Sequence, residues 1–122
     1  MEAYQGEAWG KDMYEILNRS KITLNHHGDT GPYANNMRLF EATGVGALLI
    51  TDHKDNMREM FTLDEEVIVY RSTDECVEVI QQYLDDDQKR QMIAQSGQKR
   101  TLNDHSYEER MKELITIVKK YL

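Results

Sequence analysis

The chain has 122 residues and a formal net charge of −7 at pH 7, and 30% of its residues are charged. This length suits one domain, residues 1–122, which is large enough to bury a hydrophobic core. The acidic balance and the lack of lysine- or arginine-rich runs exclude a general nucleic-acid surface, because a phosphate backbone requires a basic face.

Cysteine content and hydropathy restrict the setting of the protein. Cys76 is the only cysteine, which excludes an intrachain disulfide. The longest apolar run, residues 45–50, is too short to span a membrane, and the first residues lack the pattern of a signal peptide. We therefore expect a cytoplasmic protein without a membrane span.

The first predicted helix covers residues 11–19. Its apolar side chains Met13, Ile16 and Leu17 fall at the i, i+3 and i+4 positions of one helical face. The stretch ITLNHH, residues 22–27, then predicts a strand. The chain thus begins with a helix that leads into a strand.

Turn residues separate this strand from the next helix. Two glycines and the only proline lie in residues 28–33. The helix that follows is predicted over about residues 37–43, with Asn35 or Asn36 as its cap and Gly44 at its end.

The middle of the chain alternates strands and helices. Residues 47–51, ALLIT, form an apolar run typical of a strand covered on both faces, and residues 65–72 predict a second strand. Short helical patterns follow each of them, at residues 55–61 and 74–84. The second of these helices is expected to have Thr73 as its cap and to direct Cys76, Val77, Ile80 and Leu84 inward. This alternation predicts an α/β fold, a Rossmann-like three-layer sandwich with a mainly parallel sheet and right-handed crossovers.

Two further helices are predicted after Asp85, divided near residues 104–106. Ser106 and Glu109 form the S-x-x-E pattern of a capping box. The last helix carries an apolar stripe at helical spacing, made of Met111, Leu114, Ile115, Val118 and Leu122. This stripe either packs on the domain's own sheet or promotes self-association.

The ligand crevice of an open parallel sheet lies outside the carboxyl ends of its strands. The loops after Asn25 and Thr51 are therefore the expected places for chemistry. The first loop leads to a helix whose free amides and positive dipole end can receive a diphosphate, and Gly28 and Gly31 would allow a close backbone approach. A plain structural turn is the alternative interpretation of the same residues.

Glu41 lies about 7 Å along the axis from the start of that helix. A carboxylate can accept hydrogen bonds from both hydroxyls of a ribose cis-diol while the diphosphate stays at the helix end. Arg38, three residues earlier, either reaches a phosphate oxygen or forms a surface ion pair with Glu41.

Histidines and charged residues follow the predicted strand ends. His26 and His27 either contact the donor or acceptor of a reaction or are simply solvated, and the same alternatives hold for residues 52–54. No D-x-D sequence stands beside a strand end, so we predict that the site uses no metal.

The chain resembles the C-terminal lobe of group 1 glycosyltransferases, specifically the CgeB-like spore-maturation branch. The resemblance covers about residues 9–122 and rests on four stretches: ANNMRLFEATGVGALLITD, NMREMF, EEVIVYRSTDECVEVIQQYL and HSYEERMKEL. It implies a GT-B architecture, in which two Rossmann-like lobes face each other and the second lobe holds a nucleotide-sugar donor.

The resemblance also implies residue roles. Glu41 matches the glutamate that binds the donor ribose, and the segment at Asn35 and Asn36 faces the donor phosphates. Arg38 either contacts a phosphate or organises the site. Tyr33 stands where related enzymes often have a second glutamate. GT-B enzymes commonly need no metal, so the resemblance implies a nucleotide-sugar substrate and no cofactor.

The sequence is short for a whole enzyme of this class. We expect a fragment whose parent chain carries an N-terminal acceptor lobe, so that the isolated chain does not transfer sugar. A receiver-like signalling module is one alternative, because Asp52 ends a buried strand, although the acidic pair that would hold magnesium is missing. A non-catalytic interaction module of the same shape is the other alternative.

Overall fold

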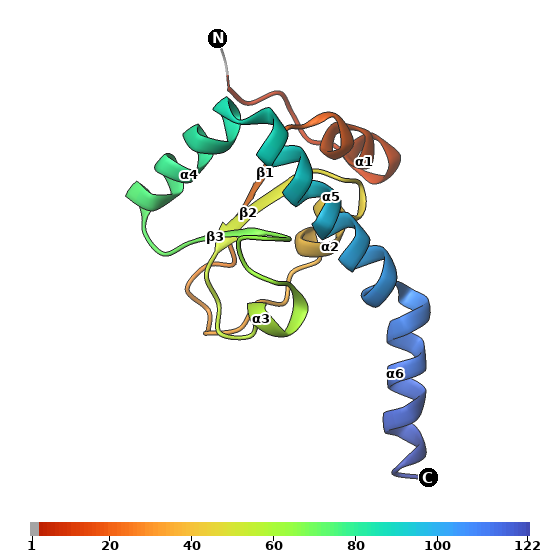
Figure 1. The fold of residues 1–122 in the computed structure, drawn as a ribbon. Coiled ribbons are helices and arrows are strands. Elements are labelled where there is room, and N and C mark those ends of the chain that lie inside the picture. Colours follow the sequence, from red (N-terminus) through yellow and green to blue (C-terminus); the bar gives the residue numbers. More distant parts are fainter. Residues whose placement is uncertain (1–2) are drawn as a thin grey trace.

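A computed structural model describes residues 3–122. The predicted α/β fold is confirmed, and each predicted strand and helix is present with boundaries shifted by a few residues (Figure 1). The elements in chain order are α1 Gly10–Arg19, β1 Ile22–Asn25, α2 Arg38–Gly44, β2 Leu48–Asp52, α3 Met57–Met60, β3 Ile68–Tyr70, α4 Thr73–Asp85, α5 Asp87–Asp104 and α6 Tyr107–Lys119.

The three strands form a parallel sheet in the order β1-β2-β3. Ile22 pairs with Leu48 at the start of the sheet, and Asp52 pairs with Tyr70 at its end. Every residue of the central strand β2 is buried, as its apolar sequence predicts for a strand covered on both faces. Because the strands are parallel, their carboxyl ends lie at one edge.

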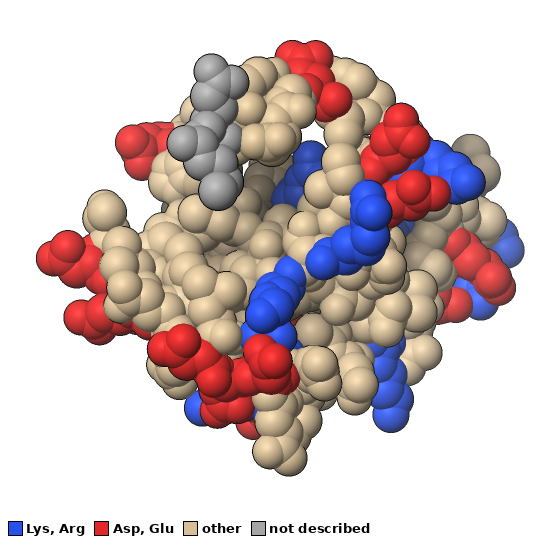
Figure 2. All heavy atoms as spheres, turned by 90° about the horizontal axis from the view of Figure 1, so that it is seen from above, with Lys and Arg blue, Asp and Glu red and all other residues tan. Residues whose placement is uncertain are grey.

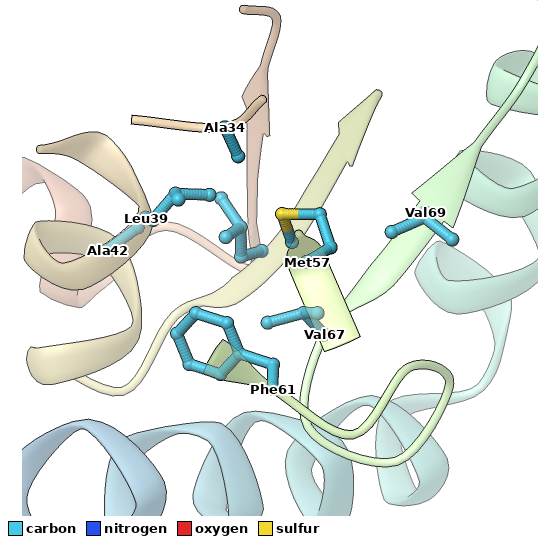
Figure 3. Packing of buried hydrophobic residues seen from close by; sticks show 8 residues of the cluster. Ala34, Leu39, Ala42, Met57, Phe61, Val67 and Val69 are labelled. Carbon is cyan, nitrogen blue, oxygen red and sulfur yellow. The ribbon is translucent and has the colours of Figure 1, made fainter. Parts of the chain in front are cut away.

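Helices α2 and α3 cover one face of the sheet. Leu39 and Ala42 of α2 pack with Leu49 of β2, and the cluster continues through Met57 and Phe61 around α3 (Figure 3). Their burial is complete or nearly so. This cluster fixes α2 against the sheet by its buried face and leaves the opposite face of the helix for other contacts.

Helices α4 and α5 cover the other face. Leu48, Ile50 and Ile68 of the sheet pack with Tyr83 of α4 and Ile93 of α5. The second half of α5 continues past α2, where the hydroxyls of two buried threonines, one from each helix, approach to 2.6 Å. The arrangement is a three-layer sandwich.

Helix α4 differs from its prediction in its N-cap residue and in which side chains point toward the sheet. Ser72, not Thr73, is the N-cap, and its hydroxyl accepts from the amide of Glu75. Val77 and Leu84 were expected inward but are 51% and 45% exposed. Tyr83 packs over the sheet with Val79 and Ile80, so the inward face of α4 includes the predicted Ile80 but neither Val77 nor Leu84.

Helix α6 extends away from the rest of the domain, beyond the end of α5 (Figure 1). Ser106 caps it by accepting from the amide of Glu109, as predicted. None of its residues is buried, so the expectation that its apolar stripe packs on the domain's own sheet is wrong. Only residues 105 and 106 separate α5 from α6, and α6 continues outward from the end of α5 (Figure 1).

The surface carries both signs of charge. On the face shown in Figure 2, lysine and arginine side chains are interspersed with acidic side chains and form no broad basic area. Within residues 3–122, no helix is both long and apolar enough to cross a membrane.

Candidate functional site

The carboxyl ends of the three strands bring polar side chains together. His26 and His27 follow β1, Lys54 follows β2, and Tyr70 ends β3. Between the strand ends and the start of α4 lies a polar pocket of about 360 Å³, whose lining includes His26, Asp52, Lys54 and Tyr70. The expected crevice is therefore present at this edge of the sheet.

Asp52 is the centre of the interactions at the strand ends. Its Oδ1 accepts from the backbone amide of His27 at 2.9 Å and from the ring Nδ1 at 2.8 Å. Burial raises the pKa of Asp52, but the hydrogen bonds from His27 outweigh burial, and the pKa lies below its ordinary value. Since an ionised carboxylate only accepts, the Nδ1 of His27 carries the proton.

His26 and His27 have different surroundings. The side chain of His27 is 2% exposed and that of His26 is 61% exposed. His26 Nδ1 lies 3.5 Å from Asp52 Oδ2, at the wall of the polar pocket, while His27 Nε2 is buried without a partner. His26 is therefore the accessible histidine of the pair.

Lys54 fixes the loop that follows β1. Its Nζ donates to the carbonyl oxygens of Gly28 and Gly31 at 2.8 and 2.9 Å. Gly28 has a φ of +76°, a conformation that favours glycine and turns its carbonyl toward the lysine. The glycines thus serve to receive Lys54.

The next residues of the same loop are held by Asn56. Its side chain accepts from the amide of Ala34 at 2.7 Å and donates to the carbonyl of Ala34 at 3.0 Å. The amide of Asp55 also donates to the carbonyl of Pro32. The loop between β1 and α2 is therefore fastened to the loop after β2.

The predicted caps of α2 take other roles. Met37 occupies the N-cap position without a side-chain bond, so the predicted asparagine cap is wrong. Asn36 donates instead to the side chain of Asn25 at 3.1 Å, and Asn35 is exposed. The loop runs along the sheet edge before the helix begins. The side-chain amide of Asn36 therefore lies next to Asn25 at the end of β1.

Glu41 and Arg38 meet on the first turn of α2. Because the helix begins at Arg38, Glu41 lies nearer its start than the predicted distance of about 7 Å. Arg38 Nη1 lies 3.5 Å from Glu41 Oε2, and the two side chains are 35% and 17% exposed. Glu41 also lines a second pocket, of about 600 Å³, formed by α1, α2, α5 and the start of α6. Its carboxylate is thus partly sheltered and next to open space.

The walls of this second pocket, which we call the helix pocket, are mainly apolar and aromatic. They include Tyr14, Phe40, Tyr107 and the ring of His105. The rings of Phe40 and His105 have centroids 5.0 Å apart, and the guanidinium of Arg110 lies 5.9 Å from the Phe40 ring centroid. The pocket therefore offers flat apolar surface with charged groups at its rim.

His105, in the wall of the helix pocket, forms hydrogen bonds with two other segments of the chain. Its Nε2 donates to the carbonyl of Met60 at 2.7 Å, and its Nδ1 accepts from Arg110 at 2.9 Å. This pattern requires a neutral ring. Burial, with the charges of Arg110 and Arg100, lowers the pKa of His105, although the Met60 carbonyl opposes the shift.

The structure separates the predicted site residues into two groups. Glu41 lines the helix pocket and pairs with Arg38, which is not one of the lining residues, whereas His26 lines the polar pocket at the strand ends. Gly31 holds Lys54 through its carbonyl. Among residues 3–122, no group of three or more histidine, cysteine, aspartate or glutamate side chains is arranged to hold a metal ion.

A comparison with protein families decides the class of the chain. A family model described as glycosyl transferase-like matches residues 2–116, nearly the whole sequence. The chain belongs to this glycosyl transferase-like family. No curated protein matches it.

The match includes every residue that lines either pocket of this glycosyl transferase-like domain. The glycosyltransferase class predicted from sequence is confirmed, and the match favours it over the receiver-like alternative. Sequence reasoning missed Tyr14, His105 and Arg110 as pocket residues. The only signal for the last two was the stretch HSYEER, which was interpreted as a helix cap and a family motif.

Proposed function

We propose that this glycosyl transferase-like domain binds a nucleotide-sugar donor and that Glu41 receives the donor ribose. The observation that carries the proposal is the position of Glu41, a carboxylate only 17% exposed in the wall of a pocket of about 600 Å³. Family membership supplies the reaction class, transfer of a glycosyl group.

The chemistry of the helix pocket suits a nucleoside. A base has a flat apolar face, and Phe40, Tyr14 and Tyr107 provide aromatic surface for it. The two oxygens of Glu41 can accept from the two hydroxyls of a ribose. Such bonds are charge-assisted, and in a sheltered pocket they are stronger than bonds between neutral groups.

Arg38 is suited to the donor diphosphate. Its ion pair with Glu41 spans 3.5 Å, and 35% of its side chain is exposed, which leaves guanidinium N–H groups for phosphate oxygens. Asn35 and Asn36 precede it on the side of the strand ends. The diphosphate would therefore lead from the ribose on Glu41 toward the sheet edge, where His26 lines the polar pocket.

We further propose that the domain is the donor lobe of a GT-B enzyme of the CgeB-like branch. In that architecture a second lobe supplies the acceptor site, so this chain alone binds the donor without transferring sugar. Tyr33, 65% exposed, would leave the sugar without the second glutamate of related enzymes. Basic side chains, not a metal, would neutralise the diphosphate.

The proposal is tested by titrating the isotope-labelled chain with UDP, GDP, ADP and CDP in the presence of a chelator. We expect amide shifts at residues 36–44 and around Tyr14 and His105 with at least one of the four. Glu41→Ala should need at least about ten times more nucleotide to reach the same shifts. Shifts that persist unchanged in this variant would contradict the role of Glu41.

The matched control is Glu78→Ala, which removes an exposed carboxylate on α4, away from the residues that line the helix pocket. This variant should bind the same nucleotide as the unmodified chain does. If no nucleotide shifts any amide of the folded chain, donor binding by this domain is refuted. Dependence on added Mg²⁺ would contradict the metal-free part of the proposal.

A further inference from the structure

Helix α6, together with Tyr121 just after its C-cap, presents a continuous apolar seam to solvent. Tyr107, Met111, Leu114, Val118 and Tyr121 follow one another at alternating intervals of four and three residues. This spacing is the one that keeps side chains facing a partner helix in a two-stranded coiled coil. Each of the five is between 44% and 86% exposed.

The seam is wider than a single row. Ile115 and Leu122 lie next to it and are 53% and 98% exposed, and Ile117 is 46% exposed. The first turn of α6 borders the helix pocket through Tyr107 and Arg110, and the rest of the helix extends away from the domain body (Figure 1). Single exposed apolar residues are normal on a protein surface, but a contiguous row of them along one helix indicates a docking surface.

The charges of α6 are distributed unequally along the helix. Its first two turns contain Glu108, Glu109 and Glu113, and the bases Arg110 and Lys112 already form ion pairs with these acids. The last turn and the residue after it contain Lys119 and Lys120. Neither lysine has an ion pair within residues 3–122.

We propose that α6 pairs in antiparallel orientation with α6 of a second copy of this chain. Antiparallel pairing places the acidic first turns of each helix beside the two lysines of the other. It also opposes the two helix dipoles, whereas parallel pairing brings like ends together. The resulting interface has two-fold symmetry, with the same seam contributed by both copies.

The middle of the seam lies near the two-fold axis. Because α6 has 13 residues, the paired region is about 20 Å long. An interface of this length is at the small end of specific interfaces, so the dimer is weak and depends on concentration. Leu114 and Ile115 lie closest to the centre and should contribute most to its stability.

The inference is tested by sedimentation and light scattering of the purified chain from about 10 µM to about 1 mM. The mass should rise from 14.3 kDa toward twice that value. Leu114→Asp should raise the dissociation constant at least tenfold without changing the fold, because Leu114 is 48% exposed. A monomer over the whole range would overturn the proposal.

Met92→Asp provides the matched control. Met92 is 61% exposed on α5 and lies outside the seam, so this variant should dimerise as the unmodified chain does. A dimer that survives Leu114→Asp and is lost in Met92→Asp would assign association to another surface.

Orientation is tested with cysteines in a Cys76→Ser background. Tyr107→Cys and Tyr121→Cys chains, mixed under oxidising conditions, should form the mixed disulfide in preference to disulfides between identical chains. A preference for identical pairs would contradict the antiparallel arrangement. Tyr107 belongs to both the seam and the helix pocket, so the two proposals are separated by variants at other residues. Leu114→Asp should leave the nucleotide-induced shifts unchanged, and Glu41→Ala should leave dimerisation unchanged.

Discussion

Thr43 of α2 and Thr101 of α5 are both buried, and their side-chain oxygens lie 2.6 Å apart. The hydroxyl of Thr43 also donates to the carbonyl of Leu39 at 2.6 Å. Thr43 has only one hydrogen to donate, so Thr101 is the donor between the two threonines. This bond docks the helix that carries Glu41 onto the helix that forms the opposite wall of its pocket.

Thr43→Val should lower the free energy of unfolding by about 1–3 kcal/mol, because it leaves the buried hydroxyl of Thr101 without its acceptor. Thr101→Val should cost less, since Thr43 keeps its bond to Leu39. The double variant should be more stable than the sum of the two losses predicts. Urea unfolding of the four proteins measures this coupling, and strict additivity would contradict it.

Gly97 allows the close approach of α5 to the backbone just before β3. A Cβ on this residue would collide with the backbone carbonyl of Glu66. Gly97→Ala should therefore destabilise the domain by about 1–3 kcal/mol.

Gly44→Ala is the matched control for this substitution. There the added carbon would lie 3.6 Å from a methyl group of Thr101, an ordinary contact. We expect no loss of stability, or a gain of up to about 1 kcal/mol from helix propensity. Equal thermal midpoints for the two alanine variants would refute the steric argument.

Protonation of His105 should make the folded chain less stable at mildly acidic pH. The pKa of His105 is lower in the folded chain than the ordinary value of 6.5. Its contribution to the free energy of unfolding is therefore complete above pH 6.5 and is lost as the pH falls through the folded pKa. Protonation of His105 Nδ1 also replaces the acceptor of the Arg110 hydrogen bond with an N–H group, so this bond is lost. From about pH 7 to about pH 5, the urea midpoint of the unmodified chain should fall more than that of His105→Gln.

Asp52 should govern stability in more acidic solution. Its pKa lies below the ordinary value of 3.8, so its stabilising effect is present above that value and is lost as the pH falls through the folded pKa. Asp52→Asn should cost about 1–3 kcal/mol at neutral pH and should weaken the acid dependence. Asp29→Asn, an exposed change, should do neither.

The fold was predictable because its signals are local. The run at residues 47–51 identifies a buried strand by itself, and Ser106 with Glu109 identifies a helix start. Which side of α4 packs on the sheet was not predictable. The choice between Val77 and Tyr83 as the inward residue depends on the space above the sheet. Periodicity alone does not contain that information.

The candidate site was predictable only in part. Arg38 and Glu41 are three residues apart on a predicted helix, so their pairing followed from spacing. The helix pocket joins α1 and α2 to residues beyond position 100, and that association depends on the docking of α5. The cap of α2 was mispredicted because Asn36 has a tertiary partner, Asn25, in place of the local helix amides.

The central claim is that Glu41 binds the ribose of a nucleotide-sugar donor. Its most direct test compares the affinity of the preferred nucleoside diphosphate with that of its 2′-deoxy counterpart, in the unmodified chain and in Glu41→Ala. We predict that loss of the 2′-hydroxyl weakens binding about tenfold in the unmodified chain, equivalent to about 1.4 kcal/mol, and has little effect in Glu41→Ala. Equal discrimination between the two nucleotides by both proteins would contradict the claim.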